Sequence, residues 1–405
     1  MSPTQLLARA ARRPGGIPSD VEVLESSNVR RIQRLLPEAT FNGLFPLANQ
    51  GAGPTAAPYT YLNFLKAAAM WPKFCDDGDD SVCLRELASL FAQYAQEVGM
   101  HDASNAEYPQ WQQGLYYYTE LGCLEDPSAT HCLYRGSTCD DPTNWAAIAW
   151  PCPPGVSYYG RGSAQMSYNF NYGPFSYAVF GDANVLLANP SLVLAPEDEH
   201  QWMAFGSGLW FYMTPQSPKP SMHDVVTGFW APNTADIAAK RISGFGALIM
   251  IINGNVECGK HTHQAADRIT FYQGFLQALG LPQEDPETLT CDTMQQFDQS
   301  SSAFVDQYWE QSWNPQACGN SCELVSYQTP NSIYDEPSRP DIPYQACMQR
   351  CFGIIPTIDL DPLEAVTYSS AGTMTESSAD PSVFEGSSTS TKSTARMTSF
   401  LSIFF

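Results

Sequence analysis

Two glutamates follow aromatic residues in the first third of the sequence, and both could carry acid–base chemistry. Glu97 stands three residues after Tyr94 and continues the apolar stripe of a predicted helix. A carboxyl on the buried side of a helix end is desolvated, which raises its pKa and keeps it protonated as a general acid. A carboxylate in such a place can also be structural, paired with a base. Glu120 follows a second aromatic run, residues 114–119, and the two acids together suggest the paired carboxylates of glycoside hydrolysis.

Between residues 158 and 174 the chain reads YYGRGSAQMSYNFNYGP, with one cation and no acid. Its polar side chains would each need a buried partner if they lay in a core. These side chains are Gln165, Ser167, Asn169 and Asn171. The same mixture suits a sugar cleft, because rings such as that of Tyr159 stack on pyranose faces while amides bond hydroxyl and acetamide groups. Taken alone, the stretch is also compatible with a tyrosine-rich loop that binds nothing.

Helices have to position these residues, because alternating strand patterns are scarce in the sequence. The helix that ends at Glu97 is predicted over residues 84–97, where apolar residues recur at helical spacing. Further helices are predicted over residues 59–74, 197–213 and 267–279, and the last of these meets a stop signal at Gly280. We therefore expect one mostly helical domain over residues 41–295.

The segments on either side of this domain differ from it in composition. Residues 1–40 are polar and basic, and we expect a disordered N-terminal extension there. Residues 296–355 form a small cysteine-containing segment, either a stapled hairpin-like module or a disulfide-tied tail, in which the pairing stays open. Its cysteines are Cys318, Cys322, Cys347 and Cys351. Residues 356–405 are rich in serine and threonine, which cannot build a core, so we expect a disordered tail.

The charge balance restricts the possible partners. The 405 residues include 20 basic and 42 acidic side chains, for a net charge of -22. Nucleic acids and anionic membrane surfaces both need cationic patches, so we expect neither as a partner. No segment approaches the roughly 18 apolar residues that a membrane span requires. The balance suits a protein that acts on a neutral or cationic substrate.

Twelve cysteines indicate disulfides rather than a metal site. No CxxC pair and no Cys/His spacing typical of zinc sites occurs, and we expect no metal. Proximity in sequence favours the pairs Cys75–Cys83 and Cys123–Cys132. Disulfides form in oxidising compartments, so we expect an extracellular, secreted protein. Residues 1–18 hold three arginines and no apolar run of signal-peptide length; they loosely resemble an organelle transit peptide and also suit a disordered tail, but the cysteines outweigh them and favour export.

With these motifs in view, the sequence resembles the family 19 chitinases over residues 41–295. The matching motifs occur in the family's order, at residues 59–61, 91–97, 114–117, 158–174, 209–215, 219–224, 228–230, 251–259 and 266–272. The resemblance implies a mainly α, two-lobed fold of the lysozyme type with a long substrate cleft, stabilised by disulfides. It also implies hydrolysis of β-1,4-linked N-acetylglucosamine polymers with inversion at the anomeric carbon.

The resemblance assigns roles to individual residues. Glu97 matches the general acid, Glu120 the general base and Ser167 a hydroxyl that helps to hold the attacking water. An inverting pair should stand about 6.5–9.5 Å apart to leave room for that water. The residues matched to sugar binding are Gln165, Asn171, Lys219 and Asn253, with Trp150 as a cleft aromatic. Glu257 and Arg268 match charged residues that tune the site. The pairs Cys139–Cys152 and Cys258–Cys291 follow the family.

Three departures from the family pattern stand out. Phe170 replaces a tyrosine, so one sugar-facing hydroxyl is absent and the preferred substrate length is in doubt. Ser163 and Ala164 replace a Pro-Ile pair, which changes the stiffness of the loop more than its chemistry. The loop over residues 122–151 is longer than in compact members and carries additional cysteines.

Three functions are compatible with these residues. An endo-acting, inverting chitinase, active on chitin or chitooligosaccharides, agrees with the retained carboxyls and Ser167. The alternatives are a hydrolase directed at a related polymer such as peptidoglycan, and a chitin-binding relative with weak or no activity. The chemistry needs two carboxyls and a water, so no cofactor is implied. We expect the protein to act as a monomer.

Overall fold

The computed structural model describes residues 20–51, 57–141, 144, 146–147, 150–180, 182–194, 200–216 and 218–304. Within these ranges the chain is helical and forms no sheet, only isolated β-bridges. The α-helices are α2 (Asp20–Glu25), α3 (Ser27–Leu35), α4 (Glu38–Leu44), α5 (Tyr61–Met70), α6 (Asp80–Val98), α7 (Gly136–Asp140), α9 (Asn169–Phe180), α10 (Asn184–Ala188), α11 (Met203–Met213), α12 (Met222–Val226), α13 (Thr234–Ala238), α14 (Phe245–Glu257), α15 (His263–Ala278) and α16 (Pro286–Leu289). Three short 3-10 helices accompany them: η1 (Gln110–Gln112), η2 (Thr130–Cys132) and η3 (Pro190–Leu194).

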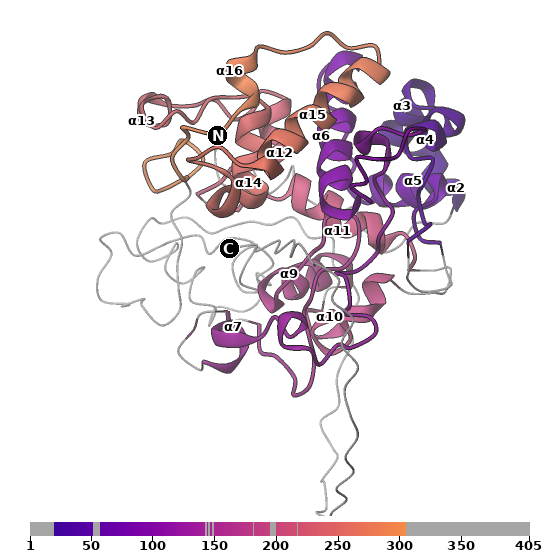
Figure 1. Cartoon of the computed structure of the whole chain (residues 1–405), viewed down its shortest axis with the longest axis vertical. Coiled ribbons are helices and arrows are strands. Elements are labelled where there is room, and N and C mark those ends of the chain that lie inside the picture. The colour runs from indigo at the N-terminus through magenta and orange to yellow at the C-terminus, as the bar shows by residue number, and fades with distance from the viewer. Residues whose placement is uncertain are drawn as a thin grey trace, which may run out of the picture.

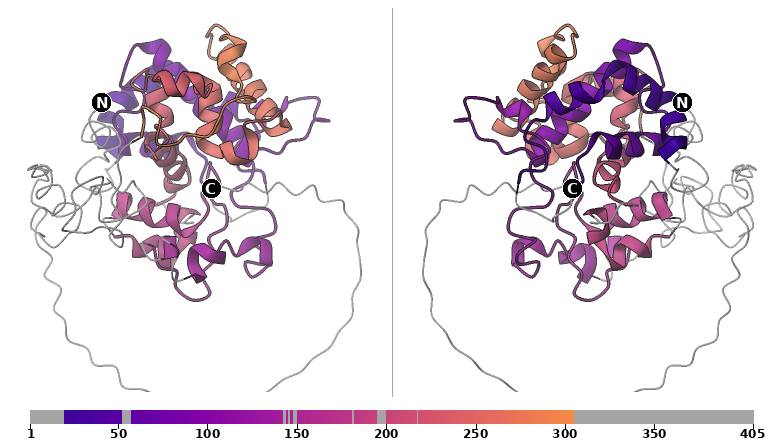
Figure 2. Two further views of the ribbon diagram at one scale, coloured as in Figure 1. Left: turned by 90° about the vertical axis from the view of Figure 1, so that its left-hand side faces the viewer. Right: turned by 90° about the vertical axis from the view of Figure 1, so that its right-hand side faces the viewer.

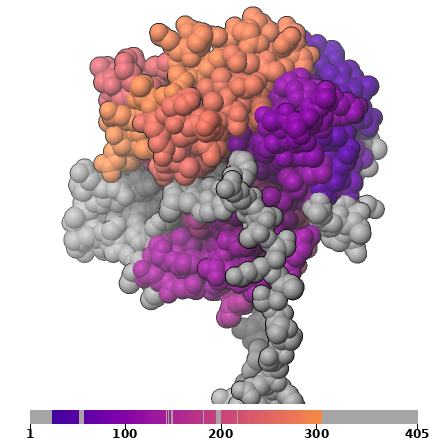
Figure 3. Space-filling model, in the orientation of Figure 1, coloured from indigo at the N-terminus to yellow at the C-terminus, as the bar shows by residue number. Residues whose placement is uncertain are grey.

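The helices gather into two groups, which we call the large lobe and the small lobe (Figure 1, Figure 2). The large lobe contains α2–α6 and α12–α16, and the small lobe contains α7, α9 and α10. Helix α11 lies between them, and every one of its residues is buried. Figure 3 shows the small lobe as the magenta and purple mass below the large lobe. The expected mainly α, two-lobed, lysozyme-like fold is confirmed.

Helix α6 places Glu97 in its last turn. The helix begins after Asp79, whose side chain accepts hydrogen bonds from the N–H groups of Ser81 and Val82, and it ends before Gly99. It packs against α15, α11 and α12. The sequence predicted a start at residue 84 rather than at Asp80, because the apolar stripe begins only after the capping turn.

The prediction of a disordered extension over residues 1–40 is wrong for its described part, residues 20–40. Helices α2 and α3 lie there, and α4 begins there. Val29, Ile32 and Leu36 are fully buried, at a spacing that suits one helix face. Three arginines and several acids lie among the apolar residues of this segment, so its overall composition is polar although one helix face is buried. Residues 1–19 lie outside the described ranges.

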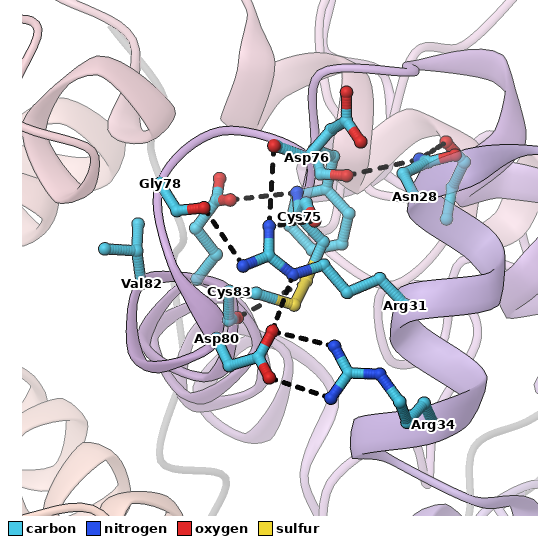
Figure 4. Close-up of a disulfide and its surroundings, with 12 residues drawn as sticks. Asn28, Arg31, Arg34, Cys75, Asp76, Gly78, Asp80, Val82 and Cys83 are labelled. Carbon is cyan, nitrogen blue, oxygen red and sulfur yellow. Dashed lines mark hydrogen bonds and ion pairs between the residues drawn. A yellow bond between two sulfur atoms is a disulfide. The ribbon is translucent and has the colours of Figure 1, made fainter.

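Helix α3 is fixed to a loop over residues 75–83 that a disulfide closes (Figure 4). Arg34 forms a bidentate ion pair with Asp80, at 2.7 and 2.8 Å. Arg31 also reaches Asp80, at 3.0 Å, and donates to the carbonyl of Gly78. The buried amide of Asn28 donates to three carbonyls near the end of α5, those of Ala68, Trp71 and Phe74. The folded unit therefore includes α3.

All four disulfides expected within residues 41–295 are present. They are Cys75–Cys83, Cys123–Cys132, Cys139–Cys152 and Cys258–Cys291. Beyond residue 295, Phe297 and Ala303 still pack into the main core. The rest of the predicted cysteine-containing segment and the Ser/Thr-rich tail, residues 305–405, lie outside the described ranges. Among the described helices, none has the length and apolar character needed to cross a membrane.

Candidate active site

The carboxyl of Glu97 is buried against an arginine. Its side chain is 1% exposed, and its Oε1 accepts a hydrogen bond from Arg268 of α15 at 2.5 Å. The apolar stripe of the sequence indicated a desolvated carboxyl and left open a pairing with a base. The structure shows both features at once. The partner is the arginine that the family resemblance placed beside the acid.

Arg268 joins Glu97 to a second buried carboxyl, that of Glu257 at the end of α14. The guanidinium donates two hydrogen bonds of 2.8 Å to Glu257 and one of 2.6 Å to Gln93. Two carboxyls thus share one guanidinium. When all three groups are ionised the trio carries one net negative charge, which is unfavourable in a buried place. A proton on either carboxyl removes that charge.

Asn253 orients Glu257 through a break in α14. Its backbone departs from helical geometry, with φ -145° and ψ 32°. Its amide Nδ2 donates to Oε1 of Glu257 at 2.7 Å. Its Oδ1 is buried and has no hydrogen-bond partner among the described residues. That oxygen can accept a hydrogen bond from a ligand, so the geometry is compatible with the predicted sugar-binding role of Asn253.

Backbone hydrogen bonds tie the segment that carries Glu120 to the end of α6. The carbonyl of Val98 accepts from the N–H groups of Tyr116 and Tyr117, at 2.9 and 3.0 Å. Glu97 immediately precedes this junction, and Glu120 follows it on the other segment. The junction therefore holds the segment before Glu120 against the end of α6, next to Glu97.

The carboxyl of Glu120 is held by two donors. The hydroxyl of Tyr134 donates to Oε1 at 2.8 Å, and the N–H of Gly160 donates to Oε2 at 3.4 Å. The backbone N–H of Glu120 in turn donates to the carbonyl of Gly160 at 3.0 Å. Burial raises the pKa of Glu120 above the usual carboxyl value, and the hydrogen bonds from Tyr134 and Gly160 act in the opposite direction.

A tight turn connects Glu120 to the polar stretch that follows it. Arg161 and Met166 exchange backbone hydrogen bonds, and the N–H of Gly162 donates to the carbonyl of Tyr118 at 2.9 Å. Gly162 has φ +77°, and a Cβ there would lie 2.6 Å from the Oγ of Ser207 on α11. Only glycine fits at this point. The turn thereby anchors the stretch to the central helix.

Ser167 follows this turn and bonds to its predicted companions. Its Oγ donates to the carbonyl of Gln165 at 3.0 Å, which leaves the oxygen lone pairs to accept from a water. The amide of Asn171 donates to the carbonyl of Ser167 at 2.9 Å. The Oδ1 of Asn171 is buried without a hydrogen-bond partner among the described residues. The structure therefore brings Gln165, Ser167 and Asn171 into one cluster.

Lys219 lies beside the Glu257 cluster, on the large-lobe side. Its Nζ donates to the carbonyl of Ile251 on α14 at 3.1 Å, two residues before Asn253. Burial lowers the pKa of Lys219 to about 8. A half-buried ammonium held by one carbonyl still has two N–H donors, so it suits a neutral ligand rich in hydroxyls.

The two predicted aromatic contacts have packing partners in this structure. The ring of Trp150 covers Gly173 of α9, where a Cβ would come within 2.3 Å of it. Tyr159 lies under the guanidinium of Arg161, whose central carbon is 3.6 Å from the ring centroid. Both rings are nearly fully buried, so their contact with sugar stays a prediction. Phe170, the departure from the family pattern, stacks on Tyr168 with ring centroids 5.2 Å apart.

Sequence analysis missed three residues that hold the site. Gln93 lies on α6 one turn before Glu97, and an amide on an apolar stripe was the available signal. Arg161 binds the carbonyl of Tyr159 and the hydroxyl of Tyr172, and it was noted only as the single cation of its stretch. Tyr134 gave no local signal, because it lies in a loop and meets Glu120 only through the fold.

Comparisons with known proteins find chitinases similar to this chain. The sequence model of the family described as "Chitinase class I" matches residues 35–291. An endochitinase of Carica papaya is 38% identical over 253 residues, which cover 62% of this chain and 93% of the relative. Chitinase 9 of Oryza sativa subsp. japonica is also 38% identical over 253 residues, covering 62% of this chain and 68% of the relative. The crystal structure of chitinase C from Streptomyces griseus HUT6037 shares 30% identity over 64% of this chain and 80% of that chain, with a TM-score of 0.45.

The family match spans more than half of the chain and contains Glu97, Glu120 and the whole polar stretch from Tyr158 to Pro174. The match begins at residue 35, so helices α2 and almost all of α3 precede it. The chain belongs to the family 19 glycoside hydrolases, the class I chitinases, and is a chitin-hydrolysing enzyme.

Proposed function

We propose that this chitinase is endo-acting and inverting, with Glu97 as general acid and Glu120 as general base. The observation that carries the proposal is that its two carboxyls lie in unlike surroundings. Glu97 shares Arg268 with Glu257, whereas Glu120 is held by the neutral donors Tyr134 and Gly160. Carboxyls in different environments can take opposite roles in one reaction.

The sharing of Arg268 suggests which carboxyl carries the proton. Both oxygens of Glu257 accept from Arg268, and Asn253 donates a further hydrogen bond to one of them. Arg268 binds Glu97 through one oxygen. A proton on Glu97 would make the trio neutral and leave the paired hydrogen bonds between Glu257 and Arg268 intact, so we place the proton there. A protonated Glu97 can protonate the glycosidic oxygen as the bond breaks.

On the opposite face, Glu120 takes a proton from water while that water attacks the anomeric carbon. Ser167 supports this step, because its lone pairs can accept a hydrogen bond from the same water. Gln165, Asn171, Lys219 and Asn253 are proposed to bind the sugars, with Tyr159 and Trp150 as aromatic contacts in a long cleft. The proposed substrate is chitin or chitooligosaccharide, cleaved within the chain.

The test is turnover and binding of chitin oligomers by two variants, with a matched control. Glu97→Gln and Glu120→Gln should each lower kcat by about 10³-fold or more, since general acid–base catalysis contributes roughly 10²–10⁴-fold. Binding of the oligomer should stay nearly intact in Glu97→Gln. Glu107→Gln, at an exposed position on the loop before η1, is the control and should keep wild-type activity.

Product analysis distinguishes the remaining candidates. The inverting mechanism yields mainly the α-anomer at the first turnover. Near-normal activity in Glu97→Gln would show that the acid is another residue. Binding without turnover in the wild type would favour a chitin-binding relative, and cleavage of peptidoglycan in preference to chitin would favour the other alternative.

We also propose that the enzyme acts outside the cell as a monomer. The disulfides within the described ranges support an oxidising compartment. Both proposed catalytic carboxyls and all proposed sugar-binding residues come from one chain, so a second copy is not needed to complete the site. Sedimentation of the active enzyme and fractionation of the producing cells test these two points.

A further inference from the structure

A loop leaves Glu120 and returns to it. We call residues 121–135 the clamp loop; it begins immediately after Glu120 and is closed by the disulfide Cys123–Cys132. The N–H of Cys123 donates to the carbonyl of Glu120 at 3.2 Å, which fixes the outgoing end. On the returning end, the hydroxyl of Tyr134 bonds the carboxyl of Glu120 at 2.8 Å. The disulfide therefore shortens the covalent path between Cys123 and Tyr134, the two residues of the loop that bond Glu120.

The clamp loop has a small apolar cluster of its own, separate from the main core. Both half-cystines and Tyr159 are its buried members, and Ala129 and Tyr134 pack against them. Tyr159 belongs to the segment next to Gly160, the second donor to Glu120. The disulfide thus packs the clamp loop against the segment of Tyr159 and Gly160, whose N–H at Gly160 bonds the other carboxyl oxygen of Glu120.

Tyr134 is fixed from several sides. Its φ of +46° lies in the left-handed region, which a bulky residue adopts only when its surroundings impose it. Its ring meets that of Tyr168 edge to face, with centroids 4.9 Å apart. The next residue, Arg135, donates to the carbonyls of Pro153 and Val156 at 2.9 and 3.0 Å. The hydroxyl consequently has little freedom to leave the carboxyl.

We propose that Tyr134 is a positioning residue for the catalytic base Glu120, and that the disulfide-closed clamp loop holds it in place. The inference rests on the proposed role of Glu120. With Tyr134 on Oε1 at 2.8 Å and the longer contact from Gly160 on Oε2, each oxygen has one donor, which restricts rotation of the carboxyl and the direction of its remaining lone pairs. A base that must take a proton from one water gains from such a fixed direction.

Other titratable groups also face Glu120, and the test has to account for them. Tyr168 and Tyr172 interact with its charge, and the exposed His131 of η2 does so from the clamp loop. Neither Tyr168 nor Tyr172 bonds the carboxyl in the described structure. A variant at Tyr134 changes the one side-chain hydrogen bond and leaves these three groups in place.

The experiment is the pH profile of kcat and kcat/KM for Tyr134→Phe on a chitin oligomer. This change keeps the ring packing and removes only the hydroxyl. We expect the acid limb to move up by about one pH unit, the shift that follows loss of one charge-assisted hydrogen bond to a carboxylate. On the plateau, kcat should fall roughly tenfold while KM changes less than about twofold, because only the positioning of the base is disturbed.

The matched control is Tyr272→Phe. Tyr272 of α15 donates to Glu284 at 3.0 Å, so it is also a tyrosine bonded to a glutamate, but outside the proposed site. We expect it to keep the wild-type pH profile. A wild-type profile and kcat in Tyr134→Phe, measured beside an inactive Glu120→Gln, overturns the inference and leaves the proposed function standing. An active Glu120→Gln overturns both.

A second variant tests the disulfide. Replacing Cys123 and Cys132 together by serine should shift the acid limb in the same direction as Tyr134→Phe, in protein that still shows a cooperative thermal transition. Combining the two changes should add little to either alone, because both act through the same hydrogen bond. A double-serine variant with the wild-type pH profile overturns the part assigned to the clamp loop.

Discussion

A buried histidine outside the active site should make the stability of this enzyme depend on pH. His223 of α12 lies between two acids, with Nδ1 at 2.5 Å from Glu86 of α6 and Nε2 at 3.3 Å from Asp77. Burial opposes the charged imidazole, but the negative charge of Glu86, with the hydrogen bonds to both acids, raises the pKa of His223 to about 9. The perturbation that exposes this effect is the variant His223→Gln.

The magnitude follows from the shift. The usual histidine value is 6.5, so a folded pKa of about 9 corresponds to roughly 3 kcal/mol of stability. A raised pKa stabilises the fold fully below pH 6.5, and the contribution disappears as the pH rises through 9. Removing the His223 imidazole at low pH should lower the free energy of unfolding by a similar amount, since loss of one member of a buried ion pair costs about 3–5 kcal/mol.

The assay is the free energy of unfolding in urea, measured for the wild type and His223→Gln at several pH values between about 6 and 10. Lys219 contributes with the opposite sign, because burial lowers its pKa to about 8 and stability returns as the pH rises toward 10.5. Lys219 is present in both proteins, so the difference between them isolates His223. His261→Gln is the matched control, an imidazole beside Asp292 that is 73% exposed.

A difference in unfolding free energy between the two proteins that stays constant with pH would contradict this reasoning. We expect His223→Gln to be about 3 kcal/mol less stable than the wild type at pH 6 and nearly equal to it at pH 10. If the free-energy difference were the same at both values, His223 would not be protonated in the folded state. The linkage between α12 and α6 would then be a packing contact without a charge.

Three further variants test other parts of the structure. Asn28→Ala should lower the free energy of unfolding by about 2 kcal/mol in urea titration, because buried carbonyls at the end of α5 lose a donor; the exposed neighbour Ser27→Ala should stay within about 0.5 kcal/mol. Gly173→Ala should lower the melting temperature by several degrees, since the new Cβ would lie 2.3 Å from the Trp150 ring. Glu257→Gln should lower kcat on chitin oligomers at neutral pH with an intact fold, because a neutral partner leaves Arg268 to stabilise the anion of Glu97; unchanged kcat would contradict the shared-arginine account.

Periodicity predicted the helices that carry Glu97 and Arg268. The stripe from Leu84 to Tyr94 indicated α6, and the pattern after Asp267 indicated α15. The two helices pack on each other, and the apolar residues of each recur where it meets the core, so the pattern is visible in the sequence. Four disulfides were predicted as well, two from proximity and two from the family.

Long-range polar contacts left no comparable pattern. In the sequence Asn28 is one more polar residue of a basic extension. In the structure it is buried and binds carbonyls that lie 40 or more residues away along the chain. Tyr134 meets Glu120 only because the clamp loop folds back on itself. Sequence patterns report which face of an element is apolar, whereas these contacts depend on how separate segments meet in space. They are therefore visible only in the structure.

Arg268 shows why the burial of Glu97 alone did not explain its chemistry. A desolvated carboxyl holds its proton, but a carboxyl beside a guanidinium tends to lose it. A single Glu97–Arg268 pair would therefore make a poor acid. Glu257 changes this balance, because it accepts two hydrogen bonds from the same guanidinium and receives a third from Asn253. In the proposed mechanism Glu257 neutralises the charge of Arg268, so that Arg268 can orient Glu97 without forcing it to ionise, and Glu97 keeps a proton for the glycosidic oxygen.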